Sequence, residues 1–321
     1  MPLGEFDLIR QFFTRRPARA VLGVGDDCAL LSPTPGQQWA VSTDLLVEGR
    51  HFLSTVPPDR LGHKALAVNL SDLAACGATP VAFTLTLSLP RVEETWLQAF
   101  AQGLFALADR AGIELVGGDT TAGPLSVGIT VMGEVPPGQA LLRSGARVGD
   151  QLWVSGSLGD ARLALEAFRG TVALSGPAFE RVRRRMEQPE PRVALGQALR
   201  GIASSAIDLS DGLVGDLGHI LQACGAGAQV DSSRLPCSAD MWAQPEPMRR
   251  QCVLSGGDDY ELLFTAAPSA ELAVRRAAST AGVEVTCVGL IVASPGLSVH
   301  DGEGHPLDLA AYAGFDHFSH P

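Results

Sequence analysis

One short segment of the chain joins a predicted strand to a predicted helix through two aspartates: Ile207-Asp208-Leu209-Ser210-Asp211-Gly212-Leu213. The apolar residues before Asp208 are typical of a strand, and Ser210 is a helix-capping residue type, which predicts a helix over residues 211–223 with Asp216 on its surface. The N-terminus of such a helix offers N–H groups to an anion, and the flanking carboxylates can hold cations beside it. A capping motif alone explains the same residue types.

Alternating strands and helices extend from this segment in both directions. In the second half of the chain, the apolar pattern predicts strands at residues 151–155, 228–231, 260–266, 285–290 and 297–300, and helices at 160–168, 191–202 and 270–281. In the first half it predicts strands at residues 21–31, 39–47, 81–89, 113–116 and 125–135, and helices at 59–76 and 93–111. Turn-rich residues 136–150 separate the two sets, so the sequence predicts an α/β (α+β) protein of two domains, residues 1–148 and 149–321.

The composition excludes several classes of protein. The chain has 321 residues, of which 46% are apolar and 18% charged, and this is typical of a globular protein with a large core. With 24 basic against 35 acidic residues, the net charge of −11 argues against a nucleic-acid partner and against an anionic membrane surface. The sole lysine, Lys64, follows no glycine-rich turn, so a P-loop that binds phosphate through its lysine is excluded.

The cysteines and the N-terminus favour a cytoplasmic protein. None of the six cysteines has CxxC spacing or a neighbouring pair of histidines, so we expect free, mostly buried thiols rather than a zinc site or disulfides. The N-terminus lacks a basic region followed by an apolar one, and no apolar run approaches the length of a membrane span.

The aspartates carry the functional signal of the sequence. Nine of them mostly lie beside Gly, Ser or Thr at the ends of apolar segments: Asp26, Asp27, Asp44, Asp72, Asp119, Asp208, Asp211, Asp258 and Asp259. Short carboxylates with small neighbours and little basic charge nearby are the ligands that Mg²⁺ requires. Aspartate also favours turns for backbone reasons, so the number of such sites, rather than any single one, predicts metal binding.

Two of these aspartates occur in more specific surroundings. Asp72 lies within the predicted helix over residues 59–76, where a half-buried carboxylate is costly unless it is paired or bound to a metal; a solvated helix face is the alternative. The run Gly117-Gly118-Asp119-Thr120-Thr121 is predicted to join two strands, with glycines that let backbone N–H groups approach a phosphate while Asp119 holds a metal.

Other polar residues give weaker signals. His51 stands alone, and a lone histidine is more often structural or solvated than functional. Arg143 follows Leu142 beside a turn and can clamp phosphate oxygens, although a plain surface arginine is the default. No GxSxG or similar spacing occurs, so covalent catalysis by a protein nucleophile is not expected.

Taken in chain order, the motifs resemble those of the thiamine-monophosphate kinase family over essentially the whole chain. The matching segments are Gly23-Val24-Gly25-Asp26-Asp27-Cys28-Ala29, Ser42-Thr43-Asp44, Gly49-Arg50-His51-Phe52, Asn69-Leu70-Ser71-Asp72-Leu73-Ala74, Gly117-Gly118-Asp119-Thr120-Thr121, Ile207 to Leu213, Ser255-Gly256-Gly257-Asp258-Asp259-Tyr260-Glu261-Leu262 and Gly314-Phe315-Asp316-His317-Phe318. Single motifs are shared with aminoimidazole ribonucleotide synthetase, selenophosphate synthetase and hydrogenase maturation proteins, whereas the ordered set is specific to the kinases.

The resemblance implies ATP-dependent phosphorylation of thiamine monophosphate to thiamine diphosphate by a homodimer. It implies an aminoimidazole ribonucleotide synthetase-like fold with mixed sheets flanked by helices. Residues 1–148 would bind metal and ATP and dimerise, and residues 149–321 would complete the active site. By analogy with the family, several Mg²⁺ ions are held by Asp27, Ser42, Thr43, Asp44, Asp72, Asp119, Asp208 and Asp211; ATP contacts Gly118, Asp119, Arg143 and Ser210; and the thiamine phosphate contacts His51, Asp258 and Phe315.

This chain departs from the family pattern at two of these positions. The family often has Glu where this chain has Asp258, so a contact from that side chain would be one methylene shorter. Phe315 stands where relatives can have Trp or Tyr, which keeps an aromatic surface.

The expected chemistry also follows from the substrate. The second pKa of a phosphate monoester is about 6, so the acceptor oxygen is already largely anionic at neutral pH and needs no strong base. We therefore expect direct in-line transfer of the phosphoryl group, without a phospho-enzyme. Two alternatives remain at this point: another ATP-dependent enzyme of the superfamily, such as an aminoimidazole ribonucleotide synthetase, and a catalytically silent nucleotide- or metal-binding module.

Overall fold

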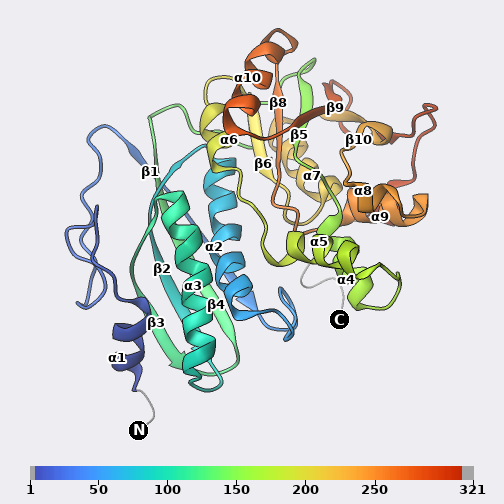
Figure 1. Cartoon of the computed structure of the whole chain (residues 1–321). Coiled ribbons are helices and arrows are strands. Elements are labelled where there is room, and N and C mark those ends of the chain that lie inside the picture. The colour runs from blue at the N-terminus through green and yellow to red at the C-terminus, as the bar shows by residue number, and fades with distance from the viewer. Residues whose placement is uncertain (1–3, 313–321) are drawn as a thin grey trace. The chain divides into compact units, whose positions relative to one another are not determined.

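The computed structural model describes residues 4–312 (Figure 1). The chain divides into two compact units. The first unit holds the residues up to Leu73 together with Ala78–Gly138, and the second holds Ala74–Gly77 together with the residues from Gln139 onward. Within residues 4–312, no helix combines the length and the apolar character needed to cross a bilayer.

A four-stranded mixed sheet forms the frame of the first unit. Its helices and strands are α1 (Glu5–Leu8), β1 (Gln38–Val47), α2 (Pro58–Ala75), β2 (Thr79–Leu89), α3 (Glu94–Ala111), β3 (Glu114–Ala122) and β4 (Ser126–Val135). The strand order is β1-β4-β2-β3, with β2 and β3 parallel and the other neighbours antiparallel. The predicted strands at 39–47, 81–89 and 125–135 and both predicted helices are confirmed.

Helices α2 and α3 cover one face of this sheet (Figure 1). They approach each other closely because each has a glycine at the contact: a Cβ on Gly62 would lie 2.1 Å from the carbonyl oxygen of Phe100, and one on Gly103 would lie 1.8 Å from that of Asp59. Apolar residues of β2 such as Leu85 and Leu87 are buried on the covered face. Burial of this face is the main stabilisation of the unit.

The opposite face of the sheet remains exposed at its β1 edge. Trp39, Val41 and Leu45 alternate along β1 and are 39%, 63% and 57% exposed. Because side chains alternate along a strand, Ser42 and Asp44 point to the other face, the one that α2 covers.

Residues 21–31 were predicted as a strand, and this prediction is wrong. The segment is a loop closed at its base by a single antiparallel bridge between Leu22 and Leu30. Gly25 at its tip has φ of 122°, a conformation that glycine adopts readily and that interrupts a strand. The backbone before the loop bonds to a side chain instead, because the amides of Ala18 and Arg19 donate to Oε1 of Glu114 at 3.0 and 2.8 Å.

The run of residues 117–121 was predicted to join two strands, whereas it lies inside β3. The strand continues through Gly117 and Gly118 to Ala122 by pairing with β2 across a register shift between Phe83 and Thr84. A Cβ on Gly118 would lie 1.8 Å from the carbonyl oxygen of Leu85, so this glycine is needed for strand pairing.

A six-stranded mixed sheet forms the frame of the second unit. Its elements are β5 (Gln151–Ser155), α4 (Asp160–Phe168), α5 (Gly176–Glu187), α6 (Val193–Ala198), β6 (Ser205–Asp208), α7 (Leu213–Cys224), β7 (Gly227–Asp231), α8 (Ala239–Trp242), α9 (Glu246–Ser255), β8 (Leu262–Ala266), α10 (Glu271–Ala281), β9 (Val285–Val292) and β10 (Gly296–His300). The strand order is β10-β7-β9-β5-β8-β6. Every strand predicted for this half is present, whereas α5, α8 and α9 were not predicted.

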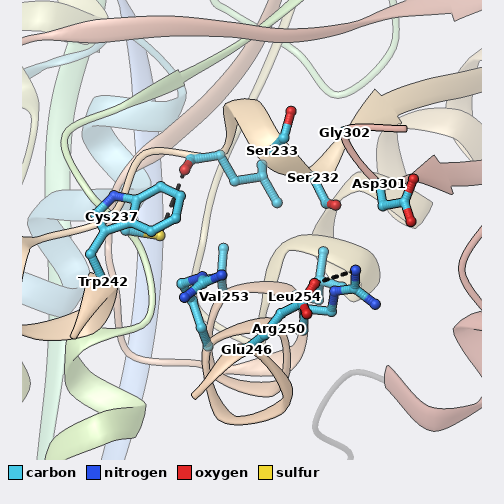
Figure 2. Close-up of a pocket in the computed structure, with 12 residues that line it drawn as sticks. Ser232, Ser233, Cys237, Trp242, Glu246, Arg250, Val253, Leu254, Asp301 and Gly302 are labelled. Atoms are coloured by element: carbon cyan, nitrogen blue, oxygen red, sulfur yellow. Dashed lines mark hydrogen bonds and ion pairs between the residues drawn. The ribbon is translucent and has the colours of Figure 1, made fainter. Parts of the chain in front are cut away.

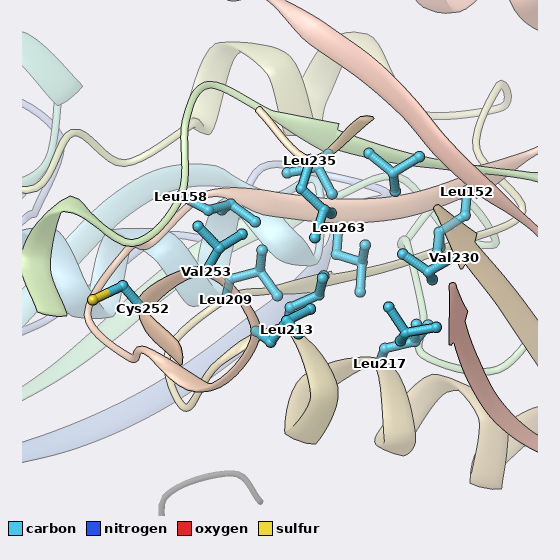
Figure 3. Packing of buried hydrophobic residues seen from close by; sticks show 14 of the residues in the cluster. Leu152, Leu158, Leu209, Leu213, Leu217, Val230, Leu235, Cys252, Val253 and Leu263 are labelled. Carbon is cyan, nitrogen blue, oxygen red and sulfur yellow. The ribbon is translucent and has the colours of Figure 1, made fainter. Parts of the chain in front are cut away.

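Apolar side chains are buried on both faces of this sheet. Leu152 and Val154 of β5 belong to one core cluster with Leu213 and Leu217 of α7 (Figure 3), and Trp153 between them belongs to a second cluster with α6 and α10. Strand alternation thus gives each core its own set of residues. The fold is the predicted one, a mixed α/β protein with two sheets flanked by helices.

The cysteines are free, as predicted. The prediction that most of them are buried is wrong, because Cys252 is the buried one, Cys28 is exposed and the other four are half-buried.

Candidate functional site

Three predicted metal ligands meet in the first unit between β1 and α2. The Ser42 hydroxyl donates to Oδ2 of Asp72 at 2.5 Å. Asp44 lies two residues further along β1 and therefore on the same face as Ser42. Both Asp44 and Asp72 are half-buried, so their oxygens are partly removed from solvent.

Asn69, one helical turn before Asp72, fixes the backbone of this group. Its side-chain oxygen accepts the N–H of Asp44 at 3.1 Å, and its amide nitrogen donates to the carbonyl of Ala65 at 3.0 Å. Asn69 is 1% exposed. Thr43 instead projects to the other face of the sheet, where its hydroxyl donates to the carbonyl of Ile129 at 3.0 Å.

Within the first unit, Asp119 lies far from the group formed by Ser42, Asp44 and Asp72. It pairs with Thr86 on β3, at the edge of the sheet opposite to β1, and its row continues through Gly128 to the exposed Leu45. Three strand spacings separate the two edges, or about 14 Å. Ligands of one cation lie within about 5 Å of each other, because metal–oxygen distances are about 2.0–2.6 Å. Asp119 and Asp44 of one chain therefore cannot share a cation.

Asp27 lies at the tip of the loop that replaces the predicted first strand. Its own N–H donates to Oδ1 of Asp26 at 2.8 Å, and both aspartates are exposed. Glu114 of β3 holds the base of this segment through the amides described above and through the N–H of Ala20 at 3.2 Å. No pattern in the sequence indicated this role of Glu114.

His51 lies just after β1 in a tight turn. Its Nδ1 accepts the N–H of Val47 at 3.0 Å, which directs Nε2 away from the backbone. The buried Lys64 donates to the carbonyl of His51 at 3.1 Å. The sole lysine therefore supports the histidine turn.

In the second unit, the segment 208–212 connects the end of β6 to the start of α7. Asp208 is 6% exposed, and helix α7 begins at Leu213 after Gly212. The predicted capping by Ser210 is wrong, because no side chain caps the helix. Asp216, which was predicted to lie on the surface, is 3% exposed and accepts the N–H groups of Ser210 and Asp211 on Oδ2 at 3.0 and 3.1 Å.

The pKa of the Asp216 carboxyl is shifted by these surroundings. Burial raises the pKa of the Asp216 carboxyl to about 7, and the charge of Asp211 adds to the rise, while the backbone N–H groups of Ser210, Asp211 and Gly212 oppose it.

Asp258 approaches the same segment from the loop before β8. Its N–H donates to the carbonyl of Ser210 at 2.9 Å, and the hydroxyl of Tyr260 donates to Oδ1 of Asp258 at 3.0 Å. Asp258 and Tyr260 have φ of 70° and 50°, a conformation that is rare outside glycine. Strained backbone of this kind persists where the surrounding structure enforces it, and it is concentrated at functional sites.

Arg143 lies at the other end of α7 from Ser210. Its carbonyl accepts the thiol of Cys224, the last residue of α7, at 3.5 Å. The helix has 12 residues, which span about 18 Å. Ser210 and Arg143 are therefore not brought together in this unit. Phe315 lies outside the described residues.

The donor set suits Mg²⁺ by its chemistry. Hydroxyl and carboxylate oxygens from two elements meet at Ser42 and Asp72, and such hard oxygen donors are those that Mg²⁺ prefers. Among residues 4–312, however, no group of three or more His, Cys, Asp or Glu side chains is gathered closely enough to hold a metal ion. Within the first unit, Asp119 is thus separate from the group formed by Ser42, Asp44 and Asp72.

A cavity of about 170 Å³ in the second unit contains none of the predicted residues. Figure 2 shows Trp242 and Cys237 at one side of it and the Glu246–Arg250 ion pair at another. Arg249 stacks on the ring of Trp242 at 4.5 Å. The cavity does not change the assignment of the site.

Comparison with known families accounts for both units. The model of the AIR synthase related protein N-terminal domain matches residues 25–135, and that of the C-terminal domain matches residues 147–302.

Full-length relatives agree with this match. The chain is 47% identical to the thiamine-monophosphate kinase of Escherichia coli K12, with all of both chains covered. The crystal structure of thiamine-monophosphate kinase from Stenotrophomonas maltophilia K279a has a TM-score of 0.86 and 44% identity, covering 96% of this chain and 99% of that one. The structure of AaThiL complexed with AMPPCP and TMP has a TM-score of 0.77 and 28% identity, covering 89% of each chain.

Proposed function

The chain belongs to the AIR synthase related family and, within it, to the thiamine-monophosphate kinases, and on that premise we propose that it phosphorylates thiamine monophosphate with ATP to give thiamine diphosphate. The observation that carries the proposal is 47% identity to a kinase of that name over the full length of both chains. A structural neighbour that binds AMPPCP and TMP together supports the same pair of substrates.

We assign the metal-binding role to two groups of residues, Ser42 with Asp44 and Asp72 in the first unit, and Asp208 with Asp211 in the second. Thr43, Asp27 and Asp119 are assigned to the same role by analogy with the family. Several bound Mg²⁺ ions would neutralise the two polyanionic substrates and stabilise the charge on the transferring phosphoryl group. Asn69 holds the backbone of Asp44, which limits the movement of that carboxylate.

Substrate contacts are assigned to the polar residues beside these groups. ATP is proposed to contact Gly118, Asp119, Arg143 and Ser210, and thiamine monophosphate to contact His51, Asp258 and Phe315. Tyr260 orients Asp258 through its hydroxyl, which supports a fixed contact from the shorter aspartate side chain.

An ADP-release assay tests the proposed function. With Mg²⁺ and ATP, we expect turnover with thiamine monophosphate and none with thiamine or with the aminoimidazole precursor. Absence of Mg²⁺-dependent turnover with thiamine monophosphate contradicts the proposal. Turnover with the aminoimidazole precursor would instead identify a synthetase of the same superfamily.

We propose direct in-line transfer between the two substrates. The acceptor phosphate is already anionic, and no residue of the proposed site is placed as a nucleophile by spacing or by contact. A chiral γ-phosphate on ATP is therefore expected to be transferred with inversion, measured by the configuration of the product. Net retention would require a phospho-enzyme and would contradict direct transfer.

We propose that the enzyme is a homodimer formed through the exposed face of the first sheet at its β1 edge. Trp39, Val41 and Leu45 expose apolar surface there, and such patches are typical of interfaces between proteins. Asp119 lies on the same face of the sheet. A second copy bound to this face would therefore lie beside Asp119, which is too far from Asp44 of its own chain to share a cation with it.

Substitution of Val41 tests the dimer. The wild-type protein is expected to sediment at twice the chain mass of 33.5 kDa, and Val41→Asp at the mass of one chain, because a buried charge opposes association. Leu272→Asp is the matched control, since Leu272 is 71% exposed on α10. A monomeric wild type, or a V41D variant that stays dimeric, contradicts this interface.

We propose a cytoplasmic location, because free cysteines are typical of a reducing compartment.

A further inference from the structure

Asp216 has no place in the proposed chemistry, yet its carboxylate is buried directly beneath the proposed metal ligands of the second unit. It lies in the first turn of α7 and is 3% exposed. Its Oδ2 accepts the backbone N–H of Ser210 at 3.0 Å and that of Asp211 at 3.1 Å. One carboxylate oxygen therefore binds two consecutive amides of the segment that carries Asp211.

The other side of the same segment is also fixed by the backbone. The carbonyl of Ser210 accepts the N–H of Asp258 at 2.9 Å, and the carbonyl of Leu209 accepts the N–H of Tyr260 at 2.8 Å. A Cβ on Gly257 would lie 2.4 Å from the carbonyl of Ser210, so the two loops approach as closely as a glycine allows. Because Asp216 holds the N–H side and the Asp258 loop holds the carbonyl side, the segment has little freedom to shift.

We propose that Asp216 is a positioning residue: through its bonds to the Ser210 and Asp211 amides it holds the segment that carries Asp208 and Asp211, and so favours metal binding by these two aspartates. The inference rests on the proposed function, in that it assumes these two aspartates are metal ligands. In this proposal Asp216 acts through the backbone, because its Oδ2 is engaged by the amides of Ser210 and Asp211.

Ordinary helix capping does not account for this arrangement. A cap needs one small polar side chain before the helix, and Ser210 is available there but makes no capping bond. The chain instead buries a carboxylate, which is costly unless the bonds it makes are needed. These bonds run backward from the helix to the residues before it, so they fix the segment rather than the helix end.

Metal binding provides a readout that a purely structural role would not change. Mn²⁺ binding to the purified full-length protein is measured by water-proton relaxation, without substrates. We expect Asp216→Ala to weaken binding at one class of site about tenfold, the scale found when groups that orient metal ligands are removed. Asp216→Asn keeps an oxygen acceptor at the same place, so its affinity is expected to stay within about threefold of wild type.

Asp150→Asn is the matched control. Asp150 is also buried in the second unit and accepts a backbone N–H, that of Arg147 at 2.9 Å, together with the hydroxyl of Ser204. It is expected to lower the melting temperature without changing Mn²⁺ affinity. If Asp216→Ala does not fold, Asp216→Glu serves in its place, since the added methylene displaces the amides and is expected to weaken Mn²⁺ binding similarly.

Either of two results overturns the inference: wild-type Mn²⁺ affinity in the folded Ala or Glu variant, or an Asn variant weakened as much as the Ala variant. The outcome is separable from the proposed function. A wild-type protein that binds Mn²⁺ but does not phosphorylate thiamine monophosphate refutes only the function. If the wild-type protein is an active kinase but the Asp216 variants bind Mn²⁺ with wild-type affinity, only the positioning role is refuted.

Discussion

Asp72→Asn is expected to lower kcat at least about 100-fold, because it replaces a carboxylate at the centre of the proposed metal site with a neutral amide. The variant is expected to lose little stability. Asparagine keeps an oxygen that can accept the Ser42 hydroxyl, and the residue is only half-buried, so neither a cavity nor an unpaired charge is created. Steady-state kinetics and thermal unfolding of the same preparation check both parts of this expectation.

Asp59→Asn on the same helix is the matched control for Asp72. Asp59 is exposed in the first turn of α2, so its charge is removed at a point where no metal role is proposed. We expect near wild-type kcat from this variant. An Asp72→Asn protein that unfolds easily while retaining full activity per folded molecule would show that Asp72 serves the packing of α2 and not the chemistry.

The largest loss of stability is expected from Glu261→Ala. Glu261 is fully buried and accepts hydrogen bonds from three side chains, with Oε2 2.6 Å from both Ser155 Oγ and Arg192 Nε, and Oε1 2.7 Å from Arg185 Nη2. Burial alone would lower the pKa of Arg185, but the charge of Glu261 raises it above its ordinary value. Arg185 is therefore charged, and removal of Glu261 takes away the carboxylate that both guanidinium groups share.

Breaking a buried ion pair from one side typically costs about 3–5 kcal/mol, and we expect a loss of this size in the free energy of unfolding measured in urea. Glu271→Ala is the control. Glu271 and Arg275 form an exposed pair at 2.9 Å on α10, whose loss is expected to cost about 0.5 kcal/mol or less. A Glu261→Ala variant with a loss as small as the control would mean that the two arginines find other partners or solvent.

Local pattern was sufficient to predict most elements of the fold. Residues 151–155 and 160–168 form the strand and helix expected, with the same bounds, because their periods of apolar residues match the buried faces of β5 and α4. Helix α5 was not predicted because its Arg-rich sequence has few apolar residues. Its buried residues Val182 and Met186 belong to a core cluster formed by residues that are distant in the sequence.

The sequence predicted candidate residues for the site but not their arrangement. Ser42 and Asp72 meet because β1 and α2 pack face to face, and no local pattern contained that packing. The separation of Asp119 from Asp44 depends on the strand order β1-β4-β2-β3, and no local pattern contains that order. The distance between Arg143 and Ser210 likewise depends on tertiary structure, because these residues lie near opposite ends of α7.

The order of residue types along the chain was enough to predict most strands and helices and to show which carboxylates are available. Tertiary structure alone decided what happens to individual polar groups. Residues 21–31 form a loop, and the amides just before this loop bond to the Glu114 side chain. Asp216 is buried against the segment that carries Asp211. Buried backbone groups must find partners, and those partners come from elements that are distant in the sequence.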